Sequence, residues 1–192
     1  MTKGNGMARS KAKSRVAGKT ILCRIERCMG CHSCEIACAV AHSQSRNLPD
    51  AVLEDPKPRR RVTLEPVGEH GLPLQCRHCE NAPCLVVCPT EAVHREGERG
   101  PVLIDEARCI GCKLCLIVCP FGVIDLAPDG KAVVKCDQCA ERVAAGELPA
   151  CVSACLTRAL QFVDIEEFSK HKRKAAAERI REEAHAEQGS ET

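Results

Sequence analysis

The spacing of cysteines constrains this chain more than any other feature. Cys109, Cys112, Cys115 and Cys119 stand at the spacing C-x2-C-x2-C-x3-C, and Pro120 follows the last of them. Three closely spaced thiolates at this spacing wrap one corner of a cubane [4Fe–4S] cluster, and the fourth reaches a neighbouring cluster. Zinc is the alternative, but zinc sites are usually closed by two separated pairs of ligands. The run therefore predicts an iron–sulfur site.

Three more runs of four cysteines make the chain an internal repeat. The first run has the same spacing, whereas the second has four residues between its middle pair and the fourth has eleven. Their members are Cys28, Cys31, Cys34 and Cys38; Cys76, Cys79, Cys84 and Cys88; and Cys136, Cys139, Cys151 and Cys155. The four runs use all of the 17 cysteines except Cys23, which we expect to be a small buried apolar side chain.

So many cysteines require either a disulfide scaffold or metal ligation. Residues 1–19 are basic but lack the apolar segment of a signal peptide, and no apolar run approaches the ~20 residues that span a bilayer. We therefore expect a reducing, cytoplasmic location, or one peripheral to the membrane through a partner, where clustered cysteines are metal ligands. Export together with a signal-bearing partner remains the alternative.

The composition supports cofactors rather than nucleic acid. The formal net charge is +2, and each oxidised cluster with its four thiolates adds about −2, so four clusters bring the protein to about −6. The positive charge thus offsets cofactors. Aromatic residues make up 2% of the chain, so we expect the clusters to replace much of the usual core.

Short elements are predicted between the runs. The Pro-rich stretch 43–71 is expected to be an extended connection, and its basic cluster (Lys57, Arg59, Arg60 and Arg61) either balances cluster charge or docks an acidic partner. The other expectations are a disordered tail over 1–19, strands over 20–25 and 159–163, a helix over 35–41, hairpins over 92–105 and 123–135, and a charged helix from residue 164.

The repeat resembles the four-cluster ferredoxin family over about residues 20–163. This family includes iron–sulfur subunits of molybdopterin oxidoreductases, of formate dehydrogenases and hydrogenlyases, and of carbon monoxide dehydrogenase systems. Within it, the segment CMGCHSCEIACAVAHS (28–43) is most similar to the small electron-transfer subunit associated with carbon monoxide dehydrogenase. Leu156 departs from the family, which commonly has proline after the last cysteine of the fourth run.

The resemblance implies that the first run pairs with the fourth and the second with the third, each run lending its last cysteine to its partner. Since all sixteen positions are cysteine, it implies four [4Fe–4S] clusters. The implied ligand sets are Cys28, Cys31, Cys34 and Cys155; Cys136, Cys139, Cys151 and Cys38; Cys76, Cys79, Cys84 and Cys119; and Cys109, Cys112, Cys115 and Cys88.

The expected fold class is α+β, with two interleaved bacterial 2[4Fe–4S] ferredoxin-like units built of small hairpins and short helices around four cubane clusters. Runs two and three lie close together in the chain and suit one unit, so runs one and four must form the other around it. The expected divisions are a tail (1–19), an outer unit (20–45 with 136–163), a connection (46–71), an inner unit (72–135) and a charged helix or tail (164–192).

We therefore expect an electron-transfer protein without a substrate site of its own, because the sequence has no nucleophile motif, phosphate loop or dinucleotide fingerprint. The resemblance suggests carbon monoxide dehydrogenase as donor and a hydrogenase as acceptor. The alternatives are an iron–sulfur wiring subunit of a molybdenum or tungsten oxidoreductase, formate dehydrogenase or hydrogenlyase, and a zinc-stabilised interaction module. No nucleic acid partner and no direct membrane insertion are expected.

Three loop residues within the runs leave a question open. Arg77, His78 and Lys113 either raise the potentials of nearby clusters or are ordinary loop residues. His32 and His78 need not be ligands, because each cluster already has four thiolates.

Overall fold

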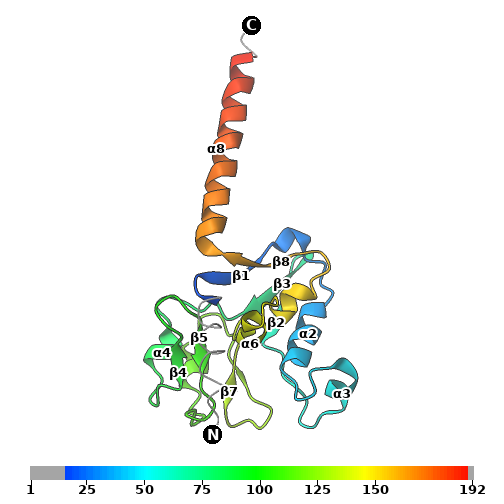
Figure 1. Cartoon of the computed structure of the whole chain (residues 1–192), viewed down its shortest axis with the longest axis vertical. Coiled ribbons are helices and arrows are strands. Elements are labelled where there is room, and N and C mark those ends of the chain that lie inside the picture. Colours follow the sequence, from blue (N-terminus) through cyan, green and yellow to red (C-terminus); the bar gives the residue numbers. More distant parts are fainter. Residues whose placement is uncertain (1–15, 190–192) are drawn as a thin grey trace.

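Residues 16–189 are described in the computed structural model of this chain. Short helices and four two-stranded antiparallel sheets form a small body, from which one long helix extends (Figure 1). The elements are β1 (Lys19–Cys23), η1 (Ile25–Arg27), α2 (Ser33–Ala41), α3 (Leu48–Leu53), β2 (Val62–Val67), β3 (His70–Gln75), α4 (Pro83–Val86), β4 (Val93–Arg95), β5 (Val102–Ile104), α5 (Leu114–Ile117), β6 (Asp125–Leu126), β7 (Val133–Val134), α6 (Ala140–Ala144), α7 (Ala150–Ser153), β8 (Leu160–Asp164) and α8 (Ile165–Gly189).

Strands β1 and β8 join the two ends of the repeat. They pair antiparallel from Lys19 opposite Asp164 to Cys23 opposite Leu160. This sheet brings the segment before the first cysteine run against the segment after the fourth. Long-range pairing of this kind cannot be read from local spacing, and it places the first and fourth runs side by side.

The two hairpins predicted between and after the inner runs are present. β4 pairs with β5, and β6 pairs with β7, whose turn contains Asp129 and Gly130. Gly130 has a φ of +69°, the left-handed conformation that an Asp-Gly turn provides. The strands are shorter than predicted, but their positions agree.

The predicted extended connection is more structured than expected. Helix α3 begins after Asn47, whose side chain accepts a hydrogen bond from the amide of Asp50 at 3.1 Å. β2 and β3 form a further hairpin, although each contains a proline, Pro66 and Pro73. Proline lacks an amide donor, but both strands of a two-stranded sheet are edge strands, and amides on the outer edge need no hydrogen-bond partner in the sheet.

The tail predicted over residues 1–19 falls mostly outside the described residues, which begin at 16. Within the described part, order begins earlier than expected. Val16 is buried, the amide of Gly18 donates to the carbonyl of Arg99 at 3.1 Å, and Lys19 begins β1. The polar composition of residues 1–19 concealed this short anchored segment.

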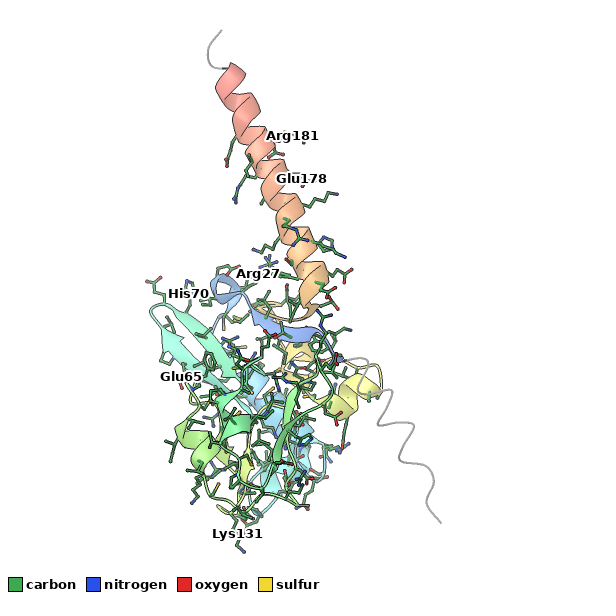
Figure 2. The ribbon with its side chains drawn as sticks, turned by 90° about the vertical axis from the view of Figure 1, so that its left-hand side faces the viewer. Arg27, Glu65, His70, Lys131, Glu178 and Arg181 are labelled. Atoms are coloured by element: carbon green, nitrogen blue, oxygen red, sulfur yellow. The ribbon has the colours of Figure 1, made fainter. Side chains whose placement is uncertain are left out.

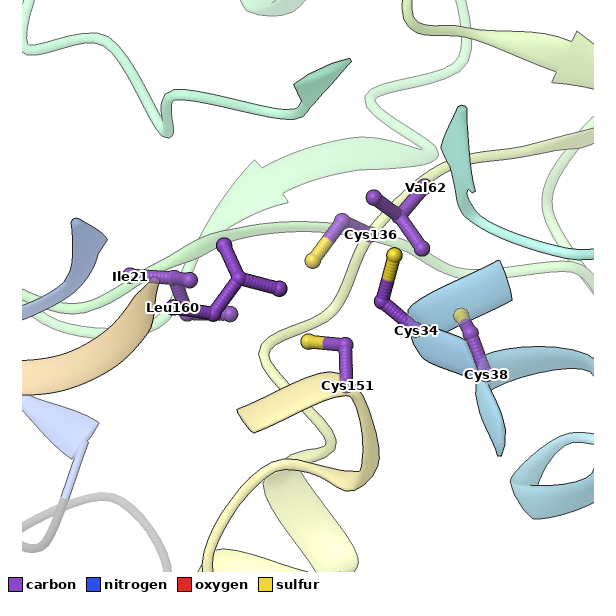
Figure 3. Packing of buried hydrophobic residues seen from close by; sticks show 7 residues of the cluster. All are labelled: Ile21, Cys34, Cys38, Val62, Cys136, Cys151 and Leu160. Carbon is purple, nitrogen blue, oxygen red and sulfur yellow. The ribbon is translucent and has the colours of Figure 1, made fainter. Parts of the chain in front are cut away.

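Buried side chains form two clusters, and cysteines belong to both. The outer core comprises Ile21, Cys34, Cys38, Val62, Cys136, Cys151 and Leu160 (Figure 3). The inner core comprises Ala82, Cys84, Val93, Val102, Cys115, Ile124 and Val133. Elements α4, β4 and β5 lie on one side of the body, and α2 and α3 lie on the other (Figure 1). The division into two ferredoxin-like units stays a prediction.

Helix α8 confirms the predicted charged helix. Asp164 caps it, since its carboxylate accepts from the amides of Glu166 and Glu167 at 3.0 and 3.1 Å. Beyond its first turns, side chains such as Glu178 and Arg181 project away from the helix into open space (Figure 2). Among residues 16–189, no helix is both long enough and apolar enough to cross a membrane.

Candidate metal centres

Three cavities of similar size are each lined by four cysteines. Their empty volumes, open solvent included, are about 320, 350 and 310 Å³. We name the cysteine sets group A (Cys28, Cys31, Cys34 and Cys155), group C (Cys76, Cys79, Cys84 and Cys119) and group D (Cys88, Cys109, Cys112 and Cys115). In each group three cysteines come from one run and the fourth is the last cysteine of another run. These are the groupings that the resemblance implied.

The remaining four cysteines form group B, which is Cys38, Cys136, Cys139 and Cys151. All four are buried. Cys38, Cys136 and Cys151 lie together in the outer core (Figure 3). Cys139 lies close enough for its charge, with that of Cys38, to act on Cys151. The structure thus brings all sixteen predicted residues into four groups, while their ligation of iron stays a prediction.

The backbone takes the same turn in every run. The residue just before the second cysteine has a positive φ in all four runs, and it is Gly30, His78, Gly111 or Gln138, at +71°, +49°, +68° and +57°. Left-handed backbone turns the chain sharply, so that successive cysteines face one space. At Gly111 a Cβ would lie 2.0 Å from the carbonyl oxygen of Lys131, so only glycine fits there.

Backbone amides point at the cysteine sulfur atoms in a repeated pattern. The amide two residues after the first cysteine donates in runs two and four, from His78 to Cys76 and from Gln138 to Cys136, both at 3.4 Å. The amide five residues after the last cysteine does the same in those runs, from Val93 to Cys88 and from Leu160 to Cys155, again at 3.4 Å. Donors of this kind favour a negatively charged sulfur.

The arrangement of the free thiols suits metal ligation rather than disulfide bonds. All 17 cysteines are free, and none forms a disulfide in residues 16–189. Burial raises the pKa of the Cys34, Cys115 and Cys139 thiols to about 11. Buried thiols grouped in fours with amide donors around them suit a multi-iron cation, which would stabilise the thiolates. The donor sets therefore fit [4Fe–4S] clusters.

A charged network ties helix α2 to the fourth run beside group B. Asp137 pairs with Arg61 at 2.8 Å and with His42 at 3.1 Å, and its Oδ1 also accepts from the amide of Cys139. Although burial opposes both shifts, these contacts hold the pKa of Asp137 well below its usual range and raise that of His42 to about 10. His42 is thus an imidazolium and Asp137 a carboxylate. Sequence reasoning missed both residues.

Part of the basic cluster has partners within the chain. Arg61 pairs with Asp137, and Arg60 pairs with Glu35 at 3.1 Å, while Glu35 also accepts from the amide of Leu64 at 2.8 Å. These contacts fasten the 46–71 connection to helix α2. For Arg60 and Arg61 a role within the fold therefore accounts for the positive charge.

The remaining singled-out side chains have local roles. His32 contacts the Glu35 carboxylate at 2.7 Å, and His78 Nδ1 accepts from the amide of Val102 at 3.1 Å. Cys23 is half-buried and packs against the outer core, so it is less enclosed than predicted. Lys135 was not singled out from the sequence, yet it is buried beside two cysteine groups.

Comparisons with known proteins identify relatives that are named as iron–sulfur and electron-transfer proteins. The model of the 4Fe-4S dicluster domain family matches residues 69–165. An iron-sulfur protein of Rhodospirillum rubrum is 40% identical over 81% of this chain and 87% of its own length. The thiosulfate reductase electron transfer subunit of Salmonella typhi is 41% identical over 74% of this chain and 73% of its own length.

A third relative has a similar name. One subunit of the anaerobic dimethyl sulfoxide reductase of Escherichia coli (strain K12) is 37% identical over 75% of this chain and 72% of its own length. These names confirm the predicted class, an iron–sulfur electron-transfer protein rather than a catalytic subunit. The family match and the length of the shared region lead to one conclusion: this chain belongs to the 4Fe-4S dicluster domain family.

Proposed function

We propose that this chain is the electron-wiring subunit of an oxidoreductase complex and that groups A to D each hold one [4Fe–4S] cluster. When bound, such a cluster accepts and releases one electron at a time. The observation that carries the proposal is the gathering of sixteen cysteines into four groups of four, three of them around cavities of about the same volume. The chain's own part is to hold, enclose and order these groups.

Packing supports the order A–B–C–D for the four groups. Helix α2 carries Cys34 of group A and Cys38 of group B. Helices α4 and α5 likewise link the two groups of the inner pair. Cys84 of group C lies on α4, and Cys88 of group D follows that helix. Cys76 of group C packs against the outer core, which contains three cysteines of group B and Cys34 of group A. This contact joins the two halves of the order.

The two ends of this order are the groups with a fully exposed cysteine. Cys31 of group A and Cys112 of group D are exposed, whereas the cysteines of group C are half-buried or buried and every cysteine of group B is buried. Apolar side chains also line both ends at the surface: Met29 at cavity A is 67% exposed and Ile110 at cavity D is 66% exposed. Exposed apolar residues beside a redox group suit contact with another protein. We assign the two ends to donor and acceptor.

The outer and inner cores are also proposed to be the two interleaved ferredoxin-like units. The segments 20–45 and 136–163 supply the outer core, together with Val62, and 72–135 supplies the inner core. The contribution of Val62 means that the 46–71 connection packs into the outer unit rather than merely joining the two. The proposed outer unit therefore includes the β2–β3 hairpin.

The names of the relatives favour a reductase partner over carbon monoxide dehydrogenase and hydrogenase. Two of the relatives are named as subunits of thiosulfate and dimethyl sulfoxide reductases. We therefore propose the alternative drawn from the sequence, a wiring subunit of a molybdenum or tungsten oxidoreductase, as the main function. The case for carbon monoxide dehydrogenase as partner rests on the family resemblance drawn from the sequence.

An anaerobic mixing experiment separates these partners. The dithionite-reduced protein, freed of dithionite, is mixed with the catalytic subunit of a thiosulfate or dimethyl sulfoxide reductase and its substrate. Reoxidation is then followed by absorbance. In a second arm the oxidised protein is mixed with carbon monoxide dehydrogenase and carbon monoxide. The proposal expects rapid reoxidation in the first arm. Reduction in the second arm alone would reverse the assignment of partner and leave the electron-transfer role intact.

A further inference from the structure

Lys135 is a buried lysine at the junction between the outer and inner cores. It follows strand β7 and directly precedes Cys136 of group B, and only 4% of its surface is exposed. Lysine is almost never fully buried unless its charge is compensated. A lysine in this position, in a chain whose core is mostly cysteine and valine, therefore needs a counter-charge.

The ammonium group of Lys135 has carbonyl partners rather than carboxylates. It donates to the carbonyl of Val102 on β5 and to the carbonyl of Cys136 at 3.3 Å. None of the ion pairs formed within residues 16–189 involves Lys135. Asp137, two positions along the chain, is already paired with His42 and Arg61. Carbonyl oxygens fix the position of the ammonium group without neutralising it.

The ammonium group of Lys135 lies beside group C. Val102, whose carbonyl accepts from this ammonium, lines cavity C together with the four cysteines of group C. His78 also lines cavity C, its ring contacts Val102, and its backbone carries the amide donor to Cys76. The contacts of Val102 therefore place the cation next to cavity C.

His78 lies between Val102 and the cysteines of group C. Its Nδ1 is 3.1 Å from both the amide nitrogen and the carbonyl oxygen of Val102, and its Nε2 is buried without a hydrogen-bond partner among the described residues. Two other cations lie near cavity C: Arg77 lines it but is exposed, and the half-buried Arg95 donates to the carbonyls of Cys79, Glu80 and Gly100. Lys135 differs from both because it is buried.

We propose that Lys135 sets the reduction potential at group C and thereby the free energy of electron transfer between the two cores. This inference rests on the proposed function. On reduction, one electron from a donor changes [4Fe–4S]2+ with four thiolates, net charge −2, to net charge −3, with no bond or proton change. A fixed positive charge with little water around it favours the more negative state. The cluster held by group C is then easier to reduce than it would be without Lys135.

Substitution of Lys135 by methionine tests the proposal, because methionine keeps the unbranched apolar stem and removes the charge. The purified holo-proteins are titrated anaerobically with dithionite, and each cluster is followed by low-temperature electron paramagnetic resonance. We expect Lys135→Met to lower the reduction equilibrium constant of one cluster by about tenfold or more, which is about 59 mV for one electron. The other midpoints should move much less.

Two control variants separate the buried charge from charge in general. Lys135→Arg keeps a cation and should restore most of the potential. Lys131→Met removes a lysine from the same hairpin whose side chain projects away from the body, so water screens its charge and every midpoint should stay close to the wild type (Figure 2). Lys135→Gln, which removes the charge but retains a donor, replaces the methionine variant if the latter binds too little iron.

Four outcomes decide the question. A selective shift with rescue by arginine supports the proposal. Unchanged midpoints in fully loaded Lys135→Met, or a shift no larger than that of Lys131→Met, would overturn it. Loss of clusters in both neutral variants but not in Lys135→Arg would make Lys135 a purely structural residue and also overturn it. A wild-type chain without iron and sulfide would instead overturn the proposed function itself.

Discussion

The outer and inner cores hold similar cysteine groups but are closed in different ways. Segments about 140 residues apart close the outer core, where β1 pairs with β8. The inner core is closed by consecutive segments, the hairpins β4–β5 and β6–β7 and the helices α4 and α5. The outer core also has carboxylate ion pairs at Asp137 and Glu35. The ion pair of the inner segments, Arg108 with Glu91, is by contrast exposed. We therefore infer that polar contacts fasten the outer core more than the inner core.

The two cores share one dependence, which gives the largest expected effect. Removing the clusters with a chelator and oxidant should unfold most of both cores, because cysteines make up much of each and would be left as grouped thiols. Far-UV circular dichroism of the holo-protein and apo-protein measures this. A spectrum unchanged after removal would contradict the shared dependence on clusters.

The next effect compares one apolar side chain in each core. Leu160 begins β8 and is buried against the cysteines of the outer core. Leu160→Ala should therefore lower the free energy of unfolding by about 2–5 kcal/mol. Val102→Ala in the inner core removes less apolar volume and should lower it by about 1.5–3 kcal/mol. Anaerobic urea titration of the holo-proteins measures both. A larger loss in the inner variant would reverse the comparison.

Polar fastening of the outer core is tested at Asp137. Asp137→Asn leaves the half-buried His42 and Arg61 without their carboxylate and should lower stability by about 1–3 kcal/mol. The matched control is Glu141→Gln, which removes the exposed ion pair with Arg46 and should change stability by less than about 1 kcal/mol. Equal effects of the two variants on the urea midpoint would show that the Asp137 network does not fasten the core.

The smallest effect is expected outside both cores. Truncation after His171 removes most of α8 but keeps Glu166, whose carboxylate pairs with Arg99 at 2.8 Å, and the cap at Asp164. Beyond His171, helix α8 projects away from the body (Figure 1), so iron content should not change and stability should change by less than about 0.5 kcal/mol. A loss of iron on truncation would give α8 a role in cluster binding.

The two cores also differ in how much of them the sequence predicts. Spacing predicts the four runs, helix-forming residues predict the short helix after Cys34, and the Asp-Gly pair predicts the hairpin at Asp129 and Gly130. All three depend on neighbouring residues. The β2–β3 hairpin was missed because Pro66 argues against a strand unless both strands are known to be edges. The left-handed turns at Gly30 and Gly111 were not predicted, although both glycines stand between cysteines of the runs.

The charged residues beside the cysteines show the limit of sequence reasoning. Lys135 and Asp137 flank Cys136, and nothing in the spacing distinguishes them from exposed loop charges such as Lys113. Their burial depends on β5 and α2 packing against the fourth run, which is a tertiary event. The grouping of first with fourth run came from the family resemblance, and spacing alone does not supply it.

Iron and acid-labile sulfide analysis of the anaerobically purified chain tests the central claim most directly. Four [4Fe–4S] clusters predict about 16 iron and about 16 sulfide per chain, with a broad visible absorbance that dithionite bleaches. The paired variants Cys155→Ser in the outer core and Cys119→Ser in the inner core should each lose about 4 iron. Stoichiometric zinc without sulfide, or a wild-type iron content near 8, would contradict the account.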